Sequence, residues 1–369
     1  MDYEDKYQEL EQYLRASEPD IAERARNWSI AIGLQDVDGL RPSQFLLEQA
    51  RENIEGRISS EEVGKRLEEY YKQKETRQEA EANGTFEADT VSERINTLLA
   101  EKAFTFSPAE LSRIHGFLFK EVLSHAGQFR TYAITKSQWI LDGETIAYGS
   151  PDSLSSLLAF DFSEEKKYEY SQHSAVEAIA HIVRFISDIW QVHAFGEGNT
   201  RTTAVFLIKY LRNFGFDVNN DSFARHSWFF RNALVRSQYE NIPMGIHRTF
   251  EPLERFMNFA VFGTPADLRN RTLHIRWKSD SAQAASSPSA QSATENAPKC
   301  KICTLNCTLE EMAVLKCIEI DHKITQKSIA QSIGKSERTV KSITSSLAER
   351  GIISRRNGRR NGWWEIRST

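Results

Sequence analysis

The sequence is poor in the features that mark membrane and secreted proteins. No apolar run approaches the roughly 20 residues that a helix needs to cross a bilayer, and the first residues, MDYEDKYQEL, are acidic rather than basic. Only four cysteines occur in 369 residues, all between positions 300 and 317, so a large disulfide scaffold is excluded. We therefore expect a cytoplasmic protein of two or three domains with no membrane partner.

The chain also lacks a strong net charge, with a formal value of −4 at pH 7. The charge is unevenly distributed, because residues 308–369 hold 12 Lys and Arg against 7 Asp and Glu, which leaves the rest of the chain near −9. The body is therefore not expected to bind anions over a broad surface. The basic tail, by contrast, suits an anionic partner.

Most of the sequence carries helical patterning. Short helices are expected within residues 17–75, and apolar residues recur at helical spacing over 179–190, which predicts a helix leading into 192–204. The following segment, AVFLIKYLRNFGF, is apolar on nearly every face and predicts a central buried helix. Residues 132–148 alternate around Asp142-Gly143, which predicts a β-hairpin.

The tail has an organisation of its own. Residues 279–298 are small and polar, as expected of a linker. Helical patterns over 309–320, 324–334 and 336–351 precede a basic hairpin at 353–366, which matches a winged helix-turn-helix. We divide the chain into an N-terminal helical segment (1–75), a main domain (76–278), a linker (279–299) and a cysteine-containing C-terminal domain (300–369).

The segment VHAFGEGNTRTTA (192–204) concentrates groups that handle phosphate. A glycine turn before a helix forms a nest of backbone amides for an anion, and Gly198 permits close approach. Glu197 suits a magnesium ion, Arg201 can neutralise phosphate, and His193 can accept a proton near neutral pH. The structural alternative is that His193 and Phe195 are core residues and Glu197 is solvated.

This segment resembles the signature of the Fic family, H-x-F-x-[D/E]-G-N-G-R-x-x-R. The resemblance extends over roughly residues 100–262, through IHGFLFKEVLSHAGQFRT, SQWILDGETIAYGSPDSL and WFFRNALVRSQYE. It implies a mainly α fold: a Fic-type helical domain with a β-hairpin flap, followed here by a small C-terminal winged-helix domain. It also implies transfer of AMP from ATP to a Ser, Thr or Tyr hydroxyl of a protein target, the chain itself included.

The resemblance assigns a role to individual residues. His193 would be the general base and Glu197 the magnesium ligand, while Trp139 and Ile140 of the flap would dock the target backbone by strand addition. The nucleotide would be held by Gly198, Asn199, Thr200, Arg201 and, with a weaker match, Asn232.

Two positions depart from the signature. Thr200 replaces the second glycine, so any positive φ needed there would be costly. Ala204 replaces the second arginine, so the usual partner of the γ-phosphate is missing. Relatives without this arginine include enzymes that move phosphate or phosphocholine, which leaves the transferred group open.

The N-terminal segment resembles the small antitoxins that inhibit Fic toxins, whose inhibitory glutamate pairs with the second arginine. The order of Gly39, Leu40 and Pro42 aligns Asp38 with that glutamate, whereas Glu55 before Gly56 is a chance match. Because the expected partner is Ala204, we expect inhibition through an acid–arginine pair to be weak or lost. The alternative is a plain structural subdomain.

The tail offers a DNA surface and a possible metal site. In the winged-helix interpretation, 336–351 is the recognition helix and the wing is basic, with contacts from Arg338, Lys341, Arg355, Arg356, Arg359 and Arg360. The alternative use of such a domain is dimerisation or target docking. Four thiolates are available for zinc, from Cys300, Cys303, Cys307 and Cys317, although Cys317 also fits a buried helix face.

Two functions from different classes remain. The first is a Fic-type protein adenylyltransferase that uses ATP and magnesium. The second is a DNA-binding regulator whose Fic domain senses a nucleotide or transfers another group. His193 favours the enzyme, because a sensor needs the anion nest but no base.

Overall fold

The structure, a computed structural model, describes residues 12–14, 18–218, 220–277, 306–357 and 362–367. The linker expected at 279–299 therefore lies outside the described residues. So do four of the predicted site residues, Cys300, Cys303, Arg359 and Arg360.

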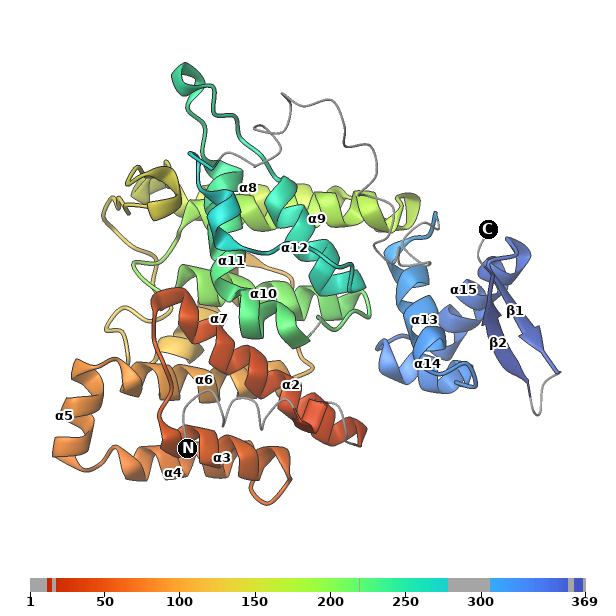
Figure 1. Cartoon of the computed structure of the whole chain (residues 1–369), viewed down its shortest axis with the longest axis horizontal. Helices are drawn as coiled ribbons and strands as arrows, with labels where there is room; N and C mark the ends of the chain where they lie inside the picture. Colours follow the sequence, from red (N-terminus) through yellow and green to blue (C-terminus); the bar gives the residue numbers. More distant parts are fainter. Residues whose placement is uncertain (1–11, 15–17, 219, 278–305, 358–361, 368–369) are drawn as a thin grey trace, which may run out of the picture.

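The N-terminal part is a layer of helices that packs against the main body (Figure 1). Helix α2 (Pro19–Gly33) continues into the 3-10 turn η1 (Leu34–Asp38), and α3 (Gln44–Ile54), α4 (Ser60–Tyr70) and α5 (Lys74–Ala82) follow. Serines Ser43 and Ser59 start α3 and α4 by accepting a backbone N–H. Trp28 of α2 belongs to a small core with α3 and α4, whereas Leu34 belongs to the main core.

The main body is built from α6 (Thr85–Ala100), α7 (Pro108–Phe119), α8 (Leu154–Lys167), α9 (Ala175–Val192), α10 (Asn199–Asn213), α11 (Asn220–Gln238) and α12 (Glu251–Phe262). Helix α10 is buried along nearly its whole length: its apolar residues from Ala204 to Leu211 belong to the main core, and its polar first residues, 199–203, are buried too. The predicted helices before and after 193–198 are thus confirmed. No helix in the described part of the chain is long and apolar enough to span a membrane.

The C-terminal part contains α13 (Leu309–Ile320), α14 (Gln326–Ser332), α15 (Glu337–Glu349) and an antiparallel pair, β1 (Ile353–Arg356) and β2 (Trp363–Ile366). These elements confirm the predicted three helices and hairpin. The unit contacts the main body mainly through α13, as Figure 1 shows. Lys316 donates to the Val261 carbonyl at 2.8 Å, and the Ala175 N–H donates to the Cys307 carbonyl at 2.7 Å.

The prediction of a β-hairpin over 132–148 is wrong. Among the described residues, the only paired strands are β1 and β2. Asp142 and Gly143 do form the predicted turn, with φ of 58° and 90°. However, Ile140 and Leu141 are both buried in a 3-10 turn, η2 (Trp139–Leu141), which breaks the alternation that a strand requires. We call residues 132–148 the flap.

Candidate active site

The loop between α9 and α10, residues 193–198, is held in one conformation by its flanking helices. Helix α9 begins with a reciprocal capping box between Ser174 and Glu177. It ends at His193, which adopts the left-handed region with φ of 51°. The Asn199 side chain accepts from the Phe195 N–H at 3.0 Å and donates to its carbonyl at 2.7 Å. The loop is therefore closed by its own asparagine, whose side chain was expected to bind phosphate.

His193 has the surroundings of a neutral base. The side chain is buried, and its Nδ1 lies 3.3 Å from the Trp190 carbonyl oxygen. Burial, assisted by the cations Lys136, Arg130 and Arg231, lowers the pKa of His193 to about 3. If Nδ1 carries the proton for Trp190, Nε2 keeps its lone pair, and Nε2 has no hydrogen-bond partner among the described residues.

A cavity of about 40 Å³ lies beside His193. Ligand pockets usually measure about 300–1,000 Å³, so this one cannot hold a nucleotide as it stands. Residues from the N-terminal layer, the flap, the 193–198 loop and α11 line it together: Asp38, Lys136, Tyr148, Trp190, His193, Glu197, Gly198, Asn199, Thr200 and Arg231. The site is thus assembled but closed.

Gly198 starts α10 with the close approach that the sequence predicts, whereas Thr200 does not need the positive φ expected of it. Gly198 has φ of 69°, and a Cβ there would lie 2.4 Å from the Phe119 ring, so glycine is required by both backbone and space. Thr200 is helical, and its hydroxyl accepts from Trp190 Nε1 at 3.0 Å. The predicted cost of a positive φ at Thr200 therefore does not arise.

Arg201 is occupied by the chain's own acids. Its side chain is 2% exposed, and its Nε lies 2.9 Å from an Asp38 carboxylate oxygen, an ion pair without hydrogen-bond alignment. Glu87 of α6 accepts from the same guanidinium at 2.5 Å, and Gln35 accepts at 3.0 Å. Asp38 thus pairs with the first arginine of the motif and not with the position of Ala204, where the sequence predicts that no pair can form.

Glu197 is the carboxylate best placed for a metal ion. It is 62% exposed and lies 3.4 Å from the Lys136 ammonium group. In the described part of the chain, no group of three or more His, Cys, Asp or Glu side chains is arranged for a metal. A single carboxylate nevertheless suits magnesium in an enzyme, since water and substrate phosphates usually supply the other ligands.

Two buried residues that the sequence analysis did not select, Arg130 and His115, bond to backbone carbonyls of the 193–198 loop. The Arg130 guanidinium donates to the carbonyls of His193 at 2.8 Å, Tyr132 at 2.7 Å and Gly149, and thus ties both ends of the flap to the histidine. His115 accepts from the Gly127 N–H at 2.8 Å, so its other nitrogen is free to donate to the Glu197 carbonyl at 3.2 Å.

The protonation of His115 fits this supporting role, because burial lowers its pKa to about 4 and keeps the ring neutral. Its ring also stacks on Phe195, with centroids 3.9 Å apart. The sequence signal was available, since both His115 and Arg130 are polar residues within IHGFLFKEVLSHAGQFRT. Their carbonyl partners in the loop, at His193 and Glu197, however, lie more than sixty residues away in the chain.

Three other residues expected at the site have distinct environments. Trp139 is 43% exposed on the flap, whereas the Ile140 side chain is buried. Asn232 is also buried and donates to the Asn270 side chain at 2.8 Å, so it does not line the cavity. Its neighbour Arg231 does line the cavity and brings a positive charge from α11.

The expected DNA contacts that the structure describes are on the surface. Arg338 and Lys341 are exposed on α15, and Arg355 and Arg356 are exposed on β1. Arg355 also packs 4.9 Å from the centre of the Trp364 ring, and Arg356 pairs with Glu365 at 2.8 Å.

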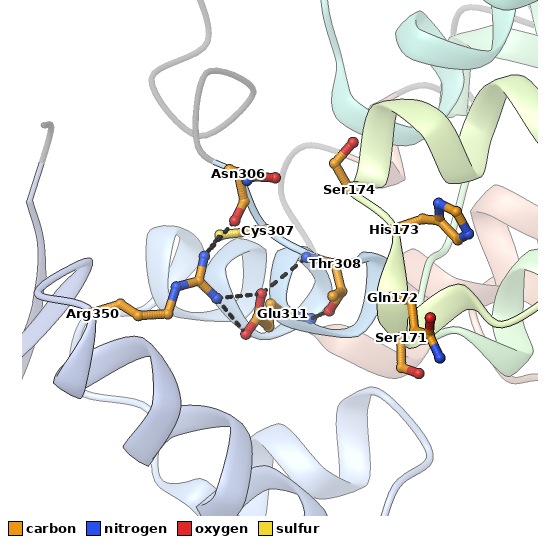
Figure 2. A pocket seen from close by; sticks show the side chains of 9 residues that line it. All are labelled: Ser171, Gln172, His173, Ser174, Asn306, Cys307, Thr308, Glu311 and Arg350. Carbon is orange, nitrogen blue, oxygen red and sulfur yellow. Dashed lines mark hydrogen bonds and ion pairs between the residues drawn. The ribbon is translucent and has the colours of Figure 1, made fainter.

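The two cysteines that the structure describes, Cys307 and Cys317, are free thiols. Figure 2 shows Cys307 next to Arg350, whose guanidinium also donates to the Glu311 carboxylate at 2.8 Å. Cys307, Glu311 and Arg350 line a cavity of about 420 Å³ between the main body and the C-terminal unit. Burial raises the pKa of both thiols, which disfavours the thiolate that zinc would need.

The chain was compared with known proteins and with a family of related sequences. No curated protein matches the chain. Among solved structures, the chain is similar to a Fic family protein from Desulfovibrio desulfuricans G20, at 13% identity and a TM-score of 0.35, with 99% of this chain and 94% of that chain covered. Residues 105–211, which include the 193–198 loop, match the Fic/DOC family and form a domain of that family.

Proposed function

We propose that the chain is a Fic-type protein adenylyltransferase that transfers AMP from ATP to a Ser, Thr or Tyr hydroxyl of a protein. Members of the Fic family commonly transfer AMP or other nucleotide groups to proteins. The observation that carries the proposal is the buried, neutral His193, whose Nε2 has no described partner and which lines one cavity with the start of α10. A base adjoining an anion nest suits phosphoryl chemistry.

The residues of the site divide the work of this reaction. His193 Nε2 accepts the proton as the target hydroxyl oxygen forms a bond to the α-phosphorus of ATP, and the bond to pyrophosphate breaks. The amides at the start of α10 stabilise the phosphate oxygens, and Arg201 neutralises their charge once it is released from its present partners. Glu197 would hold magnesium, which supplies further positive charge at the phosphates.

The N-terminal layer keeps this site closed in our proposal. Asp38 lines the cavity and, with Glu87, neutralises Arg201, so both the space and the charge for a nucleotide are withheld. The segment would thus act as the antitoxin-like inhibitor that its sequence suggests, but on Arg201. Activation requires Asp38 and Glu87 to move away from the guanidinium.

The transferred group is the finer part of the proposal. Ala204 is fully buried in α10, so no cation is supplied from that position for a γ-phosphate. AMP transfer needs firm contacts only around the α- and β-phosphates, which Arg201 and the α10 amides can provide. Another phosphate-containing group is the alternative outcome, and mass analysis distinguishes the two.

The test is incorporation of label from α-labelled ATP into protein, with the mass of the adduct determined. We expect a histidine-dependent gain of one AMP, lost in His193→Ala and retained in His173→Ala. His173 is the matched control because its side chain is 40% exposed and does not line the cavity beside His193. The variants need comparable thermal unfolding. Equal labelling by His193→Ala and the unchanged chain would contradict the proposal.

A second candidate function rests on the C-terminal unit. Its three helices, its hairpin and the exposed cations Arg338 and Lys341 suit a winged helix that binds duplex DNA. In that case the Fic domain would be a nucleotide sensor or transferase joined to a regulator. Duplex binding by the full chain that responds to ATP, without any adduct, would favour the regulator.

A further inference from the structure

The segment that follows α12 crosses the main body and ends on the flap. In Figure 1 this cyan segment passes in front of α11 before the described chain stops. Its 3-10 turn, η6 (Asn270–Leu273), is fixed by the bond between Asn270 and Asn232 and by the burial of Leu273. Residues 274–276 come next, and we call them the strap.

Three consecutive strap residues contact three residues of the flap. The Ile275 N–H donates to the Ile140 carbonyl at 2.8 Å. Arg276 forms an ion pair with Asp142, and the His274 ring lies 5.6 Å from the Trp139 ring. The strap therefore occupies three groups of residues 139–142 of the flap: an aromatic ring, a backbone carbonyl and a carboxylate.

These contacts coincide with what a docking polypeptide would need. A chain that adds itself to an exposed edge gains affinity from main-chain hydrogen bonds and specificity from the neighbouring side chains. The Ile140 side chain is buried, so its carbonyl is what it can offer to a partner, and that carbonyl is already used.

We propose that the strap is an internal occupant of the target-docking surface of the flap, and that a target segment displaces it. The proposal rests on the proposed function, since it names how that site admits its protein substrate. The segment that fits best presents an N–H to Ile140 and a basic side chain to Asp142, in the way that Ile275 and Arg276 do.

The strap is held weakly enough to be displaced. The Arg276 side chain is 68% exposed and Asp142 is 41% exposed, and ion pairs this accessible to water contribute little. The main-chain contact is a single hydrogen bond. A target that reproduces both contacts and adds its own can therefore compete.

The test uses a fluorescent peptide of sequence NRTLHIRW, residues 270–277, added to the full chain and followed by anisotropy. In the unchanged chain the strap competes with the peptide, so we expect Arg276→Asp to bind the peptide at least about fivefold more tightly. Combining Arg276→Asp with Asp142→Arg should abolish the gain. Arg269→Asp is the matched control, because Arg269 pairs with Asp267 in the same segment but away from the flap.

A second measurement connects the surface to the reaction. In the Arg276→Asp chain, the peptide should inhibit His193-dependent labelling of protein by ATP. Equal peptide affinity in the unchanged and Arg276→Asp chains would overturn the proposal, as would tight binding without inhibition. Absence of label from every variant would overturn the proposed function and the docking role, while the anisotropy would still report whether the strap occupies the flap.

Discussion

The first turns of α10 and α15 both favour anions, but the first turn of α10 is buried and that of α15 is exposed. Both helix ends attract anions, since their first amides and helix dipole point toward the incoming chain. Ser336 caps α15 and accepts from the Thr339 N–H, whereas Gly198 gives α10 no side-chain cap. The cation of α10, Arg201, is buried against acids, while Arg338 and Lys341 of α15 are exposed.

This difference distinguishes a buried helix start, for which we propose chemistry, from an exposed one, for which we propose binding. The start of α10 is buried, and burial strengthens electrostatic effects, so in the proposed reaction the chain's own acids would first have to leave Arg201. The start of α15 is open, and its cations can meet phosphates without rearrangement, at the expense of strength in salt.

The largest loss of stability is expected at Gly198, where the start of α10 packs most tightly. Gly198→Ala places a methyl group against Phe119 at a positive φ and should lower the free energy of unfolding by about 3 kcal/mol or more. Gly263→Ala is the matched control, with φ of 70° and open space around it, and should cost about 1 kcal/mol. Thermal or urea unfolding measures both, and equal costs would show that the contact with Phe119 is unimportant.

The arginines of the two regions should differ next most strongly. Arg130→Ala leaves four carbonyl groups, those of Tyr132, Gly149, Val192 and His193, without this donor and should lower stability by about 3 kcal/mol. Arg338→Ala, on the exposed helix, should change stability by no more than about 0.5 kcal/mol. Similar losses in unfolding experiments would contradict the distinction between a buried support and a surface cation.

The exposed cations at the start of α15 should instead affect binding to duplex DNA. If Arg338 and Lys341 each contact a phosphate, the double alanine variant should reduce the slope of log affinity against log salt by about 2. The matched control is Lys323→Ala, an exposed cation outside α15. An unchanged slope, or a change in oligomeric state instead, would assign the C-terminal unit to dimerisation or docking.

The smallest predicted effect is a flat response to pH in the closed region. Because the pKa of His193 is lowered to about 3, its neutral form persists as the pH falls from 8 to 5. Protonation of His193 should therefore not reduce labelling in that range. Initial rates at constant ionic strength measure this, and a decline near pH 6.5 that belongs to His193 would show that the base is hydrated during turnover.

Local patterns in the sequence predicted much of the fold. Helix α9 and the three C-terminal helices follow apolar periodicity and side-chain caps that lie within the segments themselves. Helix α10 follows its run of apolar residues instead. The flap failed as a hairpin because alternation does not determine pairing, and the Ile140 carbonyl bonds to Ile275 instead of to a neighbouring strand.

The candidate site was predictable in its residues but not in its contacts. The sequence indicated His193, Glu197 and Gly198 because they lie close together in one motif. In the structure all three line one cavity. The pairing of Arg201 with Asp38 and Glu87 joins segments more than a hundred residues apart, and no local signal marks it. The family signature pairs the inhibitory acid with its second arginine, here Ala204, and so does not predict that Asp38 pairs with Arg201.

The most direct test of the account is equilibrium binding of ATP with magnesium to the full chain and to Asp38→Ala/Glu87→Ala. Glu55→Ala serves as the control, because Glu55 does not line the cavity. We expect the double variant to bind ATP at least about tenfold more tightly, since Arg201 is freed to contact phosphate, and Arg201→Ala to remove that gain. Equal affinity in all variants would contradict the claim that the chain's own acids close a nucleotide site.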